Sequence, residues 1–246
     1  MQEVMNQMKR EIQARYGNVI RHGVSSQLSR SIPAEIYTNE QLRNMPEELI
    51  KKSFPCGNPV LEANLKLGET VLDLACGTGL DCFLASSLVG ERGWVYGLEF
   101  TKEMLEQAIG FRRRMKLKNV KFLHADMEQI PLARSSVDVV MSNCGINLAC
   151  DKQQVIDGVT RVLKPQGRLV IADIVSQGSI PDAMKEDPDA WTWCMGGACS
   201  WDSWHDMLSE SYFDVKAIKR RDYQVELDKD QILKFEAVTI TATRGD

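Results

Sequence analysis

The sequence of 246 residues lacks several features that would assign a chain to a class at once. It has no uninterrupted apolar run of the roughly 18 residues that a membrane-spanning helix needs. Its start, MQEVMNQMKREIQ, has no apolar core of a signal peptide. Basic residues are not in excess, because 34 acidic against 30 basic side chains leave a net charge of −4. We therefore expect a cytoplasmic protein with neither membrane nor nucleic-acid partners, since capture of nucleic acid relies on basic surfaces.

The sequence also lacks the spacings that turn cysteines into structural sites. There is no CxxC and no paired Cys and His spacing of a zinc site. Seven cysteines are nevertheless present, and in the cytoplasm we expect them to be thiols rather than disulfides. A hydrophobic content of 43% with 26% charged residues excludes wholesale disorder. The thiols of a folded chain therefore need another explanation.

Strand and helix patterns alternate from residue 70 onward. This alternation predicts an α/β fold with a mostly parallel sheet and helices on both faces. Two late strands with little helix between them predict an antiparallel hairpin at one edge of the sheet. The expected strands cover 71–74, 94–98, 120–124, 137–141, 168–174, 215–218 and 237–244, and the expected helices cover 80–89, 101–116, 151–163 and 204–210.

Residues 1–69 are expected to form an N-terminal helical cap or lid on a domain of residues 70–246. Apolar residues at helical spacing predict an amphipathic helix over 1–16. A second helix is expected over 40–52, and two prolines and a glycine predict a loop over 55–59. The stretch 179–203 is irregular, and we expect its tryptophans, Trp191, Trp193 and Trp201, to pack as a cap over a site.

A loop of small residues follows the first expected strand. Ala75, Gly77 and Gly79 would allow backbone amides to approach a ligand, and the helix start behind them favours an anionic group. Glu99 ends the next strand, where a carboxylate can bind both hydroxyls of a ribose. The third glycine of an NAD fingerprint is absent. The pattern instead resembles the D-x-G-x-G-x-G loop of class I S-adenosylmethionine methyltransferases, with alanine at the first glycine.

That resemblance implies the Rossmann-like methyltransferase fold and S-adenosyl-L-methionine as cofactor. It implies that Glu99 binds the ribose, Asp126 the adenine amine and Met127 the adenine face. It also brings Asp73 near the methionine ammonium group. The residues assigned to the cofactor in this way are Asp73, Ala75, Gly77, Gly79, Glu99, Asp126, Met127 and Asn143.

The acceptor should lie at the end of the fourth strand, because ligands bind outside the carboxyl ends of parallel strands. The sequence there is SNCGINL, without the Asn/Asp-Pro-Pro-aromatic turn of many nucleic-acid methyltransferases. None of the three histidines stands in a catalytic pattern. A thiol or a lone-pair nucleophile is therefore favoured, because neither requires a general base.

Four further stretches resemble the arsenite methyltransferase family. They are SNCGINLACDKQQV at 142–155, WTWCMGGACSW at 191–201, FPCGNPV at 54–60 and AVTITATR at 237–244. The resemblance implies that Cys56, Cys144 and Cys194 bind trivalent arsenic as the substrate, not as a structural metal. Arsenic(III) prefers thiolates as a soft metalloid, and three of them leave its lone pair free to attack the cofactor methyl in line.

The expected partners are a trivalent arsenical, glutathione or another thiol, and a thioredoxin-type reductant. Many family members carry a further cysteine pair near the N-terminus, whereas residues 1–55 contain none and RHGVSSQLS occupies that region. Cys150, Cys199 or external thiols would have to replace it. Cys76 and Cys82 are expected to be small core residues.

Two alternatives stay open at this point. The first is a small-molecule thiol- or C-methyltransferase with the same cofactor site. The second is a non-catalytic arsenical-binding or sensing protein.

Overall fold

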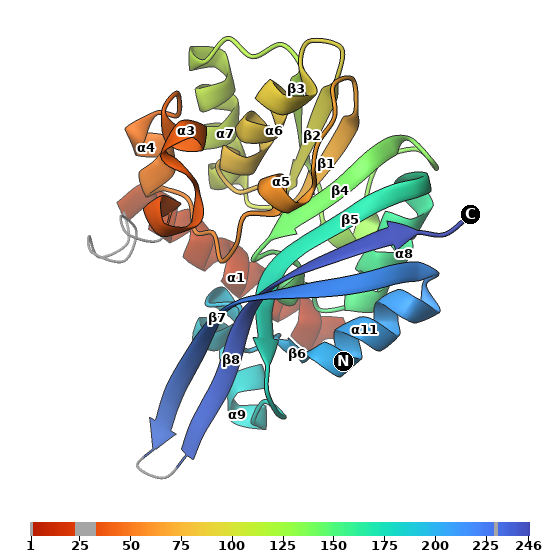
Figure 1. Ribbon diagram of the computed structural model, residues 1–246. Helices are drawn as coiled ribbons and strands as arrows, with labels where there is room; N and C mark the ends of the chain where they lie inside the picture. The colour runs from red at the N-terminus through yellow and green to blue at the C-terminus, as the bar shows by residue number, and fades with distance from the viewer. Residues whose placement is uncertain (1, 23–32, 229–230) are drawn as a thin grey trace.

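The computed structural model describes residues 2–22, 33–228 and 231–246. Its centre is one mixed sheet with the strand order β3-β2-β1-β4-β5-β8-β7, and the short β6 pairs with β5 (Figure 1). The strands are β1 Thr70–Leu74, β2 Trp94–Glu99, β3 Val120–His124, β4 Val137–Asn143, β5 Leu163–Ser176, β6 Cys199–Ser200, β7 Phe213–Asp228 and β8 Gln231–Arg244.

The five strands β3, β2, β1, β4 and β5 are parallel to one another, whereas β8 is antiparallel to both β5 and β7. The predicted parallel sheet with an antiparallel edge hairpin is therefore confirmed. Strands β5, β7 and β8 are longer than predicted, and β5 begins at Leu163, directly after the preceding helix. The ladder to β8 runs from Arg168 to Ser176, so pairing extends the strand beyond its apolar stretch.

Helices cover both faces of the sheet, as predicted (Figure 1). The α-helices of the sheet region are α5 Pro59–Glu62, α6 Leu80–Val89, α7 Lys102–Arg114, α8 Lys152–Val162 and α11 Trp201–Glu210. Short helices follow strands β3 and β4 or lie in the 179–203 stretch, namely η1 Met127–Gln129, η2 Ile146–Leu148, α9 Asp182–Lys185 and α10 Pro188–Thr192. Asp151 caps the start of α8, because its side chain accepts a hydrogen bond from the Gln154 amide.

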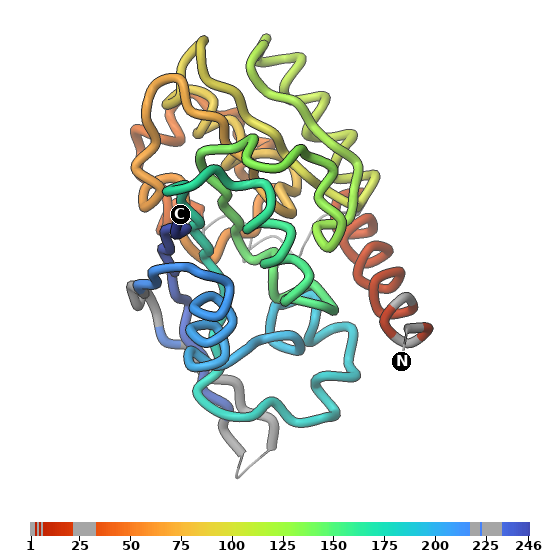
Figure 2. The backbone as a smooth tube through the Cα atoms, turned by 90° about the vertical axis from the view of Figure 1, so that its right-hand side faces the viewer, coloured from red at the N-terminus to blue at the C-terminus, as the bar shows by residue number. Residues whose placement is uncertain are grey.

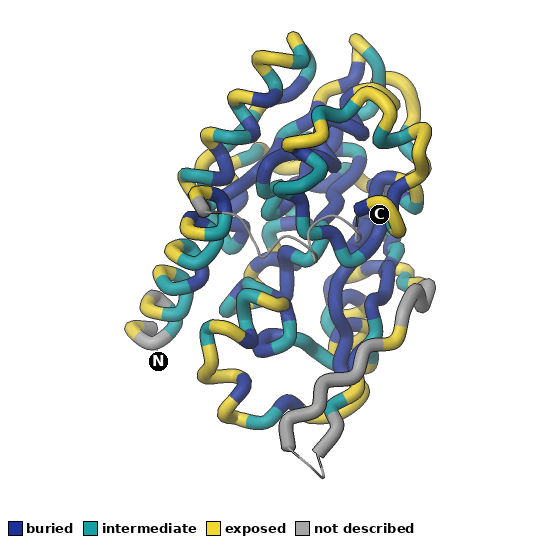
Figure 3. The backbone as a smooth tube through the Cα atoms, turned by 90° about the vertical axis from the view of Figure 1, so that its left-hand side faces the viewer, coloured by how far each residue is buried: buried dark blue, intermediate teal, exposed yellow. Residues whose placement is uncertain are grey.

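The two faces of the sheet bury separate cores, because side chains alternate along each strand. Val71 of β1 packs with α6 and Phe111 of α7 on one face. Leu72 and Leu74 pack with α8 and Trp204 of α11 on the other. Figure 3 shows these strands as a buried band, with the exposed positions of the helices toward solvent. A rigid sheet of this kind holds the ends of its strands in fixed positions.

The long N-terminal helix α1, Gln2–His22, confirms and extends the predicted amphipathic helix. Figure 2 shows it running along one side of the molecule. It contacts both α7 and α10, so it joins the β1–β3 side of the sheet to the 179–203 stretch. The division into a cap of residues 1–69 and a domain of residues 70–246 stays a prediction.

The single helix predicted over 40–52 is wrong. The structure has two short helices there, α3 Asn39–Leu42 and α4 Glu47–Lys51. Pro46 is extended and forms the N-cap of α4. A proline inside a helix would lose an amide hydrogen bond and clash with the preceding turn, so the chain breaks at this residue.

Among the helices of the described residues, none combines the length and the apolar content that crossing a membrane requires.

The largest stability effect in the sheet region is expected at Trp204. Its side chain is fully buried between α11 and the sheet, and its indole N–H has no hydrogen-bond partner. Trp204→Ala should lower the free energy of unfolding by about 3–5 kcal/mol, because it leaves a large cavity. Urea denaturation followed by circular dichroism measures this. Trp204→Phe should cost clearly less, since it fills most of the space and removes the unpaired donor; equal losses would contradict this account.

Candidate active site

A cavity opens at the carboxyl ends of the parallel strands. The ends of β1, β2 and β4 supply its floor, and α1 and the segment before α5 supply residues from outside the sheet. The predicted cofactor residues on its wall are Asp73, Ala75, Gly77, Glu99, Met127 and Asn143. The sheet edge expected from the topology is therefore hollowed at the expected place.

The turn after β1 uses left-handed backbone at three positions. Ala75 has φ +54°, Gly77 +54° and Gly79 +93°. A left-handed conformation costs a residue with a Cβ roughly 1–2 kcal/mol, which explains why glycine is usual where this chain has alanine. A Cβ on Gly145 would stand 2.7 Å from the Ala75 Cβ, so the alanine is accommodated by a glycine opposite. Gly79 shapes the turn and lies outside the cavity wall.

The Glu99 carboxylate lies buried at the end of β2. One of its oxygens accepts a hydrogen bond from the Gly77 amide at 3.0 Å and the other from the Thr101 amide at 2.7 Å. Burial raises the pKa of Glu99 from its ordinary value, while these amide hydrogen bonds oppose the rise. The acid is thus held against the glycine loop, facing the cavity.

Two further buried acids lie below the loop. Asp73 accepts a hydrogen bond from the Cys82 thiol, and Asp81 accepts one from the Tyr37 hydroxyl at 2.8 Å. Burial raises the pKa of Asp73 well above its ordinary value and that of Asp81 to about 6. Tyr37 and Asp81 were not predicted, because neither belongs to the glycine-loop pattern.

Of the two neighbouring residues Asp126 and Met127, only Met127 lines the cavity. The buried Met127 side chain lines the wall, as expected for a residue that packs on an adenine ring. Asp126 caps η1 and its carboxylate binds Lys9 of α1 at 2.7 Å, outside the cavity wall. Its assignment to the adenine amine stays a prediction.

The structure brings Cys56, Cys144 and Cys194 together beside this cavity. The thiols of Cys194 and Cys56 both interact with that of Cys144, which raises the Cys144 pKa well above its ordinary value. The Cys194 thiol also donates to the Cys144 carbonyl at 3.1 Å. All three pack on a small apolar core that includes Ile174 and Phe235. We call these residues the three-thiol cluster.

Cys144 belongs to both places, since it also lines the cavity. Its φ of +51° and that of Cys194, +61°, lie in the left-handed region. Such backbone costs about 1–3 kcal/mol at a residue other than glycine and is concentrated at functional sites. Here it turns the ends of β4 and α10 so that the two thiols meet.

Asn143 holds the Cys56 loop against strand β4. Its side-chain oxygen accepts hydrogen bonds from the Cys56 and Gly57 amides at 3.1 and 3.3 Å. Its amide nitrogen donates to the Gly57 carbonyl at 2.8 Å and to Asp81 at 3.0 Å. Asn143 lines the cavity, as its assignment to the cofactor requires, and it also links the Cys56 loop to the start of α6.

Asp173 is a site residue that the sequence reasoning missed. One of its oxygens lies within 4.8 Å of the Cys56 and Cys144 sulfurs. The carboxylate accepts hydrogen bonds from the Asn147 amide at 3.0 Å and the Ile174 amide at 2.9 Å, and burial raises its pKa to about 7. Its position near the carboxyl end of β5, a parallel strand of the sheet, was the available signal.

Two glycines allow the loop that carries Cys194 to pack closely against Asn147 and Trp191. The Asn147 side chain donates to the Cys194 carbonyl at 3.0 Å and to the Ile174 carbonyl at 2.6 Å. A Cβ on Gly197 would stand 2.0 Å from the Asn147 carbonyl oxygen, and one on Gly196 would meet Trp191 at 2.5 Å. The Gly-Gly pair of the 191–201 stretch is therefore a packing requirement of this loop.

Helix α1 covers the boundary between the cavity and the three-thiol cluster. Tyr16 lines the cavity, and its hydroxyl donates to the Thr192 carbonyl of α10 at 2.8 Å. Burial and the nearby Cys194 and Cys144 raise its pKa well above the ordinary value. Arg15 adds an ion pair to Asp189 of α10.

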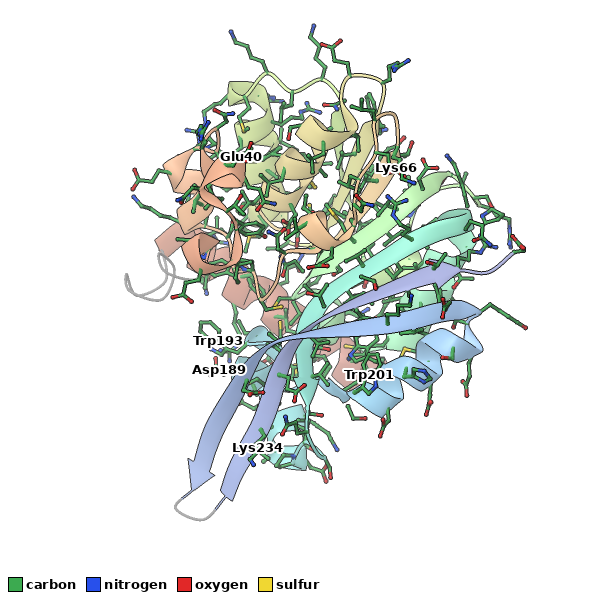
Figure 4. The ribbon with its side chains drawn as sticks, viewed as in Figure 1. Glu40, Lys66, Asp189, Trp193, Trp201 and Lys234 are labelled. Atoms are coloured by element: carbon green, nitrogen blue, oxygen red, sulfur yellow. The ribbon has the colours of Figure 1, made fainter. Side chains whose placement is uncertain are left out.

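The predicted tryptophan cap is wrong for Trp193, whose side chain is 53% exposed. Figure 4 shows Trp193 near Asp189, whereas Trp201, the first residue of α11, lies on the other side of strands β7 and β8 in this view. Only Trp191 packs on the Gly196-Gly197 turn. The three indole rings therefore form no common cover.

The remaining cysteines divide as follows. Cys82 is fully buried, as predicted, whereas Cys76 is half-buried and lines the cavity. Cys150 lies beside α1, with its amide bound to Glu128, and Cys199 pairs with Val175 of β5. Most of the RHGVSSQLS segment lies outside the described residues.

The cavity fits the cofactor that the glycine loop implies. Gly77 leaves space that a Cβ would touch only at 4.0 Å from Met104, so a ligand can approach the loop backbone there. Glu99 offers both oxygens at the same wall, and Met127 offers an apolar surface farther along. S-adenosylmethionine combines a ribose, an adenine and a cationic methionine moiety, and the buried acids suit that cation.

Comparisons with known proteins agree with this geometry. A family model described as a methyltransferase domain matches residues 65–211. The arsenite methyltransferase of Halobacterium salinarum is 42% identical over 71% of this chain and 45% of its own length, and that of Mus musculus is 35% identical over 80% and 55%. The chain spans about half the length of these curated relatives.

A solved structure of an arsenic(III) S-adenosylmethionine methyltransferase from Chlamydomonas reinhardtii is 29% identical and superposes with a TM-score of 0.70, covering 85% of this chain and 73% of that one. Fold, cavity and sequence matches therefore agree. The chain has the class I S-adenosylmethionine-dependent methyltransferase fold and belongs to the methyltransferase domain family, with arsenite methyltransferases among its relatives.

Proposed function

We propose that this chain transfers a methyl group from S-adenosylmethionine to trivalent arsenic held by the thiolates of Cys56, Cys144 and Cys194. The observation that carries the proposal is the double position of Cys144, which lines the cavity and contacts the other two thiols. An acceptor held by this residue is next to any ligand in the cavity. The names of the relatives support the choice of arsenic.

The three-thiol cluster can take up arsenite without a base. Arsenic(III) hydroxide and three thiols yield one tri-thiolate and three water molecules, so each thiol proton leaves in water. The raised pKa values of Cys56, Cys144 and Cys194 are therefore compatible with uptake near neutral pH. The apolar core around the cluster then excludes water from the bound arsenic.

The chain's remaining work is to orient two ligands. S-adenosylmethionine supplies an electrophilic methyl group when bound. Glu99 would hold the ribose, Met127 the adenine face and Asp73 the ammonium end. Fixing a nucleophile and a methyl carbon about 3–3.5 Å apart and in line supplies a large part of the rate enhancement of such a transfer. Product turnover would rely on external thiols such as glutathione, or on a thioredoxin-type reductant.

Methyl transfer to arsenic is tested by incubating the purified chain with arsenite, glutathione and methyl-labelled S-adenosylmethionine. Mass spectrometry should then find the label in a methylated arsenical. Label in methylated glutathione instead would support the small-molecule methyltransferase alternative. Calorimetry without measurable cofactor binding would support the non-catalytic alternative, a protein that binds or senses arsenicals.

Replacing Asn143 by alanine is expected to weaken arsenite binding at least about tenfold, since it leaves two amides of the Cys56 loop without acceptors and the loop loses its position. Equilibrium dialysis with arsenite, on protein whose circular dichroism is native, measures this. Asn143→Asp keeps the acceptor oxygen but brings a charge to Asp81, so an intermediate loss is expected. Wild-type arsenite affinity in a folded Asn143→Ala protein would contradict the positioning role.

A further inference from the structure

A carboxylate adjoins the three-thiol cluster on the side of strand β5. The Asp173 oxygen and the sulfurs of Cys56 and Cys144 all lie within 4.8 Å of one another. Asp173 is 1% exposed, and two backbone amides hold its oxygens in place. A pyramidal tri-thiolate of arsenic has no need of this fourth, harder donor. The position of Asp173 therefore suits a ligand that binds a carboxylate oxygen as well as thiolates.

Thiophilic divalent cations have that preference. Zn²⁺ takes four ligands in a tetrahedron, with sulfur at about 2.3 Å and carboxylate oxygen at about 2.0–2.2 Å, so that neighbouring donors stand about 3.5–3.8 Å apart. The upper limit of 4.8 Å between the donors of Cys56, Cys144 and Asp173 is within about 1 Å of this spacing. Cys194 does not belong to this group of three donors, and its thiol donates to the Cys144 carbonyl at 3.1 Å. The fourth position of the tetrahedron is therefore left to water, as in zinc sites with three protein ligands.

We propose that Cys56, Cys144 and Asp173 form a three-ligand site for a thiophilic divalent cation, Zn²⁺ or Cd²⁺, which competes with trivalent arsenic for the thiols of Cys56 and Cys144. The cation enters through the cavity, where Cys144 is accessible. On coordination each thiol releases its proton to the solvent, and no group is oxidised or reduced. This binding is independent of methyl transfer, because it requires neither cofactor nor arsenite.

The proposal is tested by titrating the full chain with Cd²⁺ in a thiol-free reducing buffer and following the thiolate-to-cadmium charge-transfer absorbance. One equivalent should saturate the band, Zn²⁺ should shift the titration, and arsenite should abolish the band. Asp173→Asn should weaken Cd²⁺ binding at least about tenfold, as expected for loss of a ligand, and should weaken arsenite binding less, because the asparagine still offers one acceptor to the backbone amides. The control Cys150→Ser removes a thiol outside the cluster and should titrate as wild type.

A wild-type chain without a saturable one-to-one band overturns the proposal, as does an Asp173→Asn chain with undiminished Cd²⁺ affinity or with equal losses for both ligands. If the Asp173→Asn variant lacks native circular dichroism, Cys56→Ser is measured instead. Wild-type Cd²⁺ affinity in Cys56→Ser would also overturn the proposal. Intact arsenic methylation without a Cd²⁺ site would contradict this inference alone. An intact Cd²⁺ site without arsenic methylation would contradict only the proposed function.

Discussion

The Cys144→Ser variant is expected to lose arsenite methylation by more than about 100-fold. The hydroxyl is a harder and weaker ligand for arsenic than a thiolate. Even the outer-shell partners of a ligand are worth 10–100-fold in affinity, so a direct ligand should cost more. Cys144 is also the thiol that the other two contact, so its removal leaves Cys56 and Cys194 without a shared neighbour. Label transfer to arsenic, quantified by mass spectrometry, measures the loss.

Cofactor affinity provides the internal check on that variant. Serine is close in size to cysteine and fills the same part of the cavity wall, so calorimetry with S-adenosylmethionine should give a near wild-type dissociation constant. The control variant Cys150→Ser removes a thiol that lies beside α1 and outside the cluster, so it should keep its arsenite methylation activity. Near wild-type arsenic methylation by the Cys144→Ser variant would contradict the assignment of arsenic to the three-thiol cluster.

Replacing Glu99 by glutamine should weaken S-adenosylmethionine binding by about 10- to 100-fold. A hydrogen bond to a charged group contributes about 1.5–3 kcal/mol, and the buried carboxylate would accept from the ribose hydroxyls. Glutamine keeps the shape but retains only one acceptor oxygen. It also leaves one of the Gly77 and Thr101 amides without its present partner. Calorimetric titration with S-adenosylmethionine measures the change.

The matched control is Glu103→Gln, which removes an acid of α7 paired with Arg21 at the surface. Exposed ion pairs contribute about 0–1 kcal/mol, so cofactor affinity should stay near wild type. Arsenite binding by Glu99→Gln should also be unchanged, because Glu99 and the three-thiol cluster come from different segments. An unaltered cofactor affinity in Glu99→Gln would contradict its role in binding the ribose.

The alternation of the sheet region was predictable because each element there satisfies a local rule. Apolar runs such as 71–74 are buried on both faces, and Asp151 begins α8 with a side-chain cap. The helix expected over 40–52 is divided in the structure, because Pro46 cannot continue a helix and instead caps α4. The lengths of β7 and β8 could not be predicted either, since they follow from pairing along a long antiparallel ladder.

The types of residue in the site were predictable from the sequence, but the contacts among them were not. Motif spacing and family resemblance indicated Glu99, Met127 and the three cysteines, and the cavity lies at the expected strand ends. Tyr16 was missed because it reaches the site only through packing of α1, which is distant in the chain. Asp173 was missed although its place near the end of β5 was a signal, because only the structure shows the two thiols beside it. Asp126 was assigned to adenine, yet its carboxylate binds Lys9 of α1, a contact that no local pattern indicates.

The sequence by itself determined the order of elements, the glycine loop and the types of residue available for chemistry, because those depend on neighbours within a few positions. Only the tertiary structure decided that Cys56, Cys144 and Cys194 meet near one carboxylate, with Cys144 on the wall of the cavity. Their convergence depends on left-handed turns at Cys144 and Cys194 and on Asn143 and Asn147 binding distant backbone. Such contacts form only when the sheet has fixed the ends of its strands.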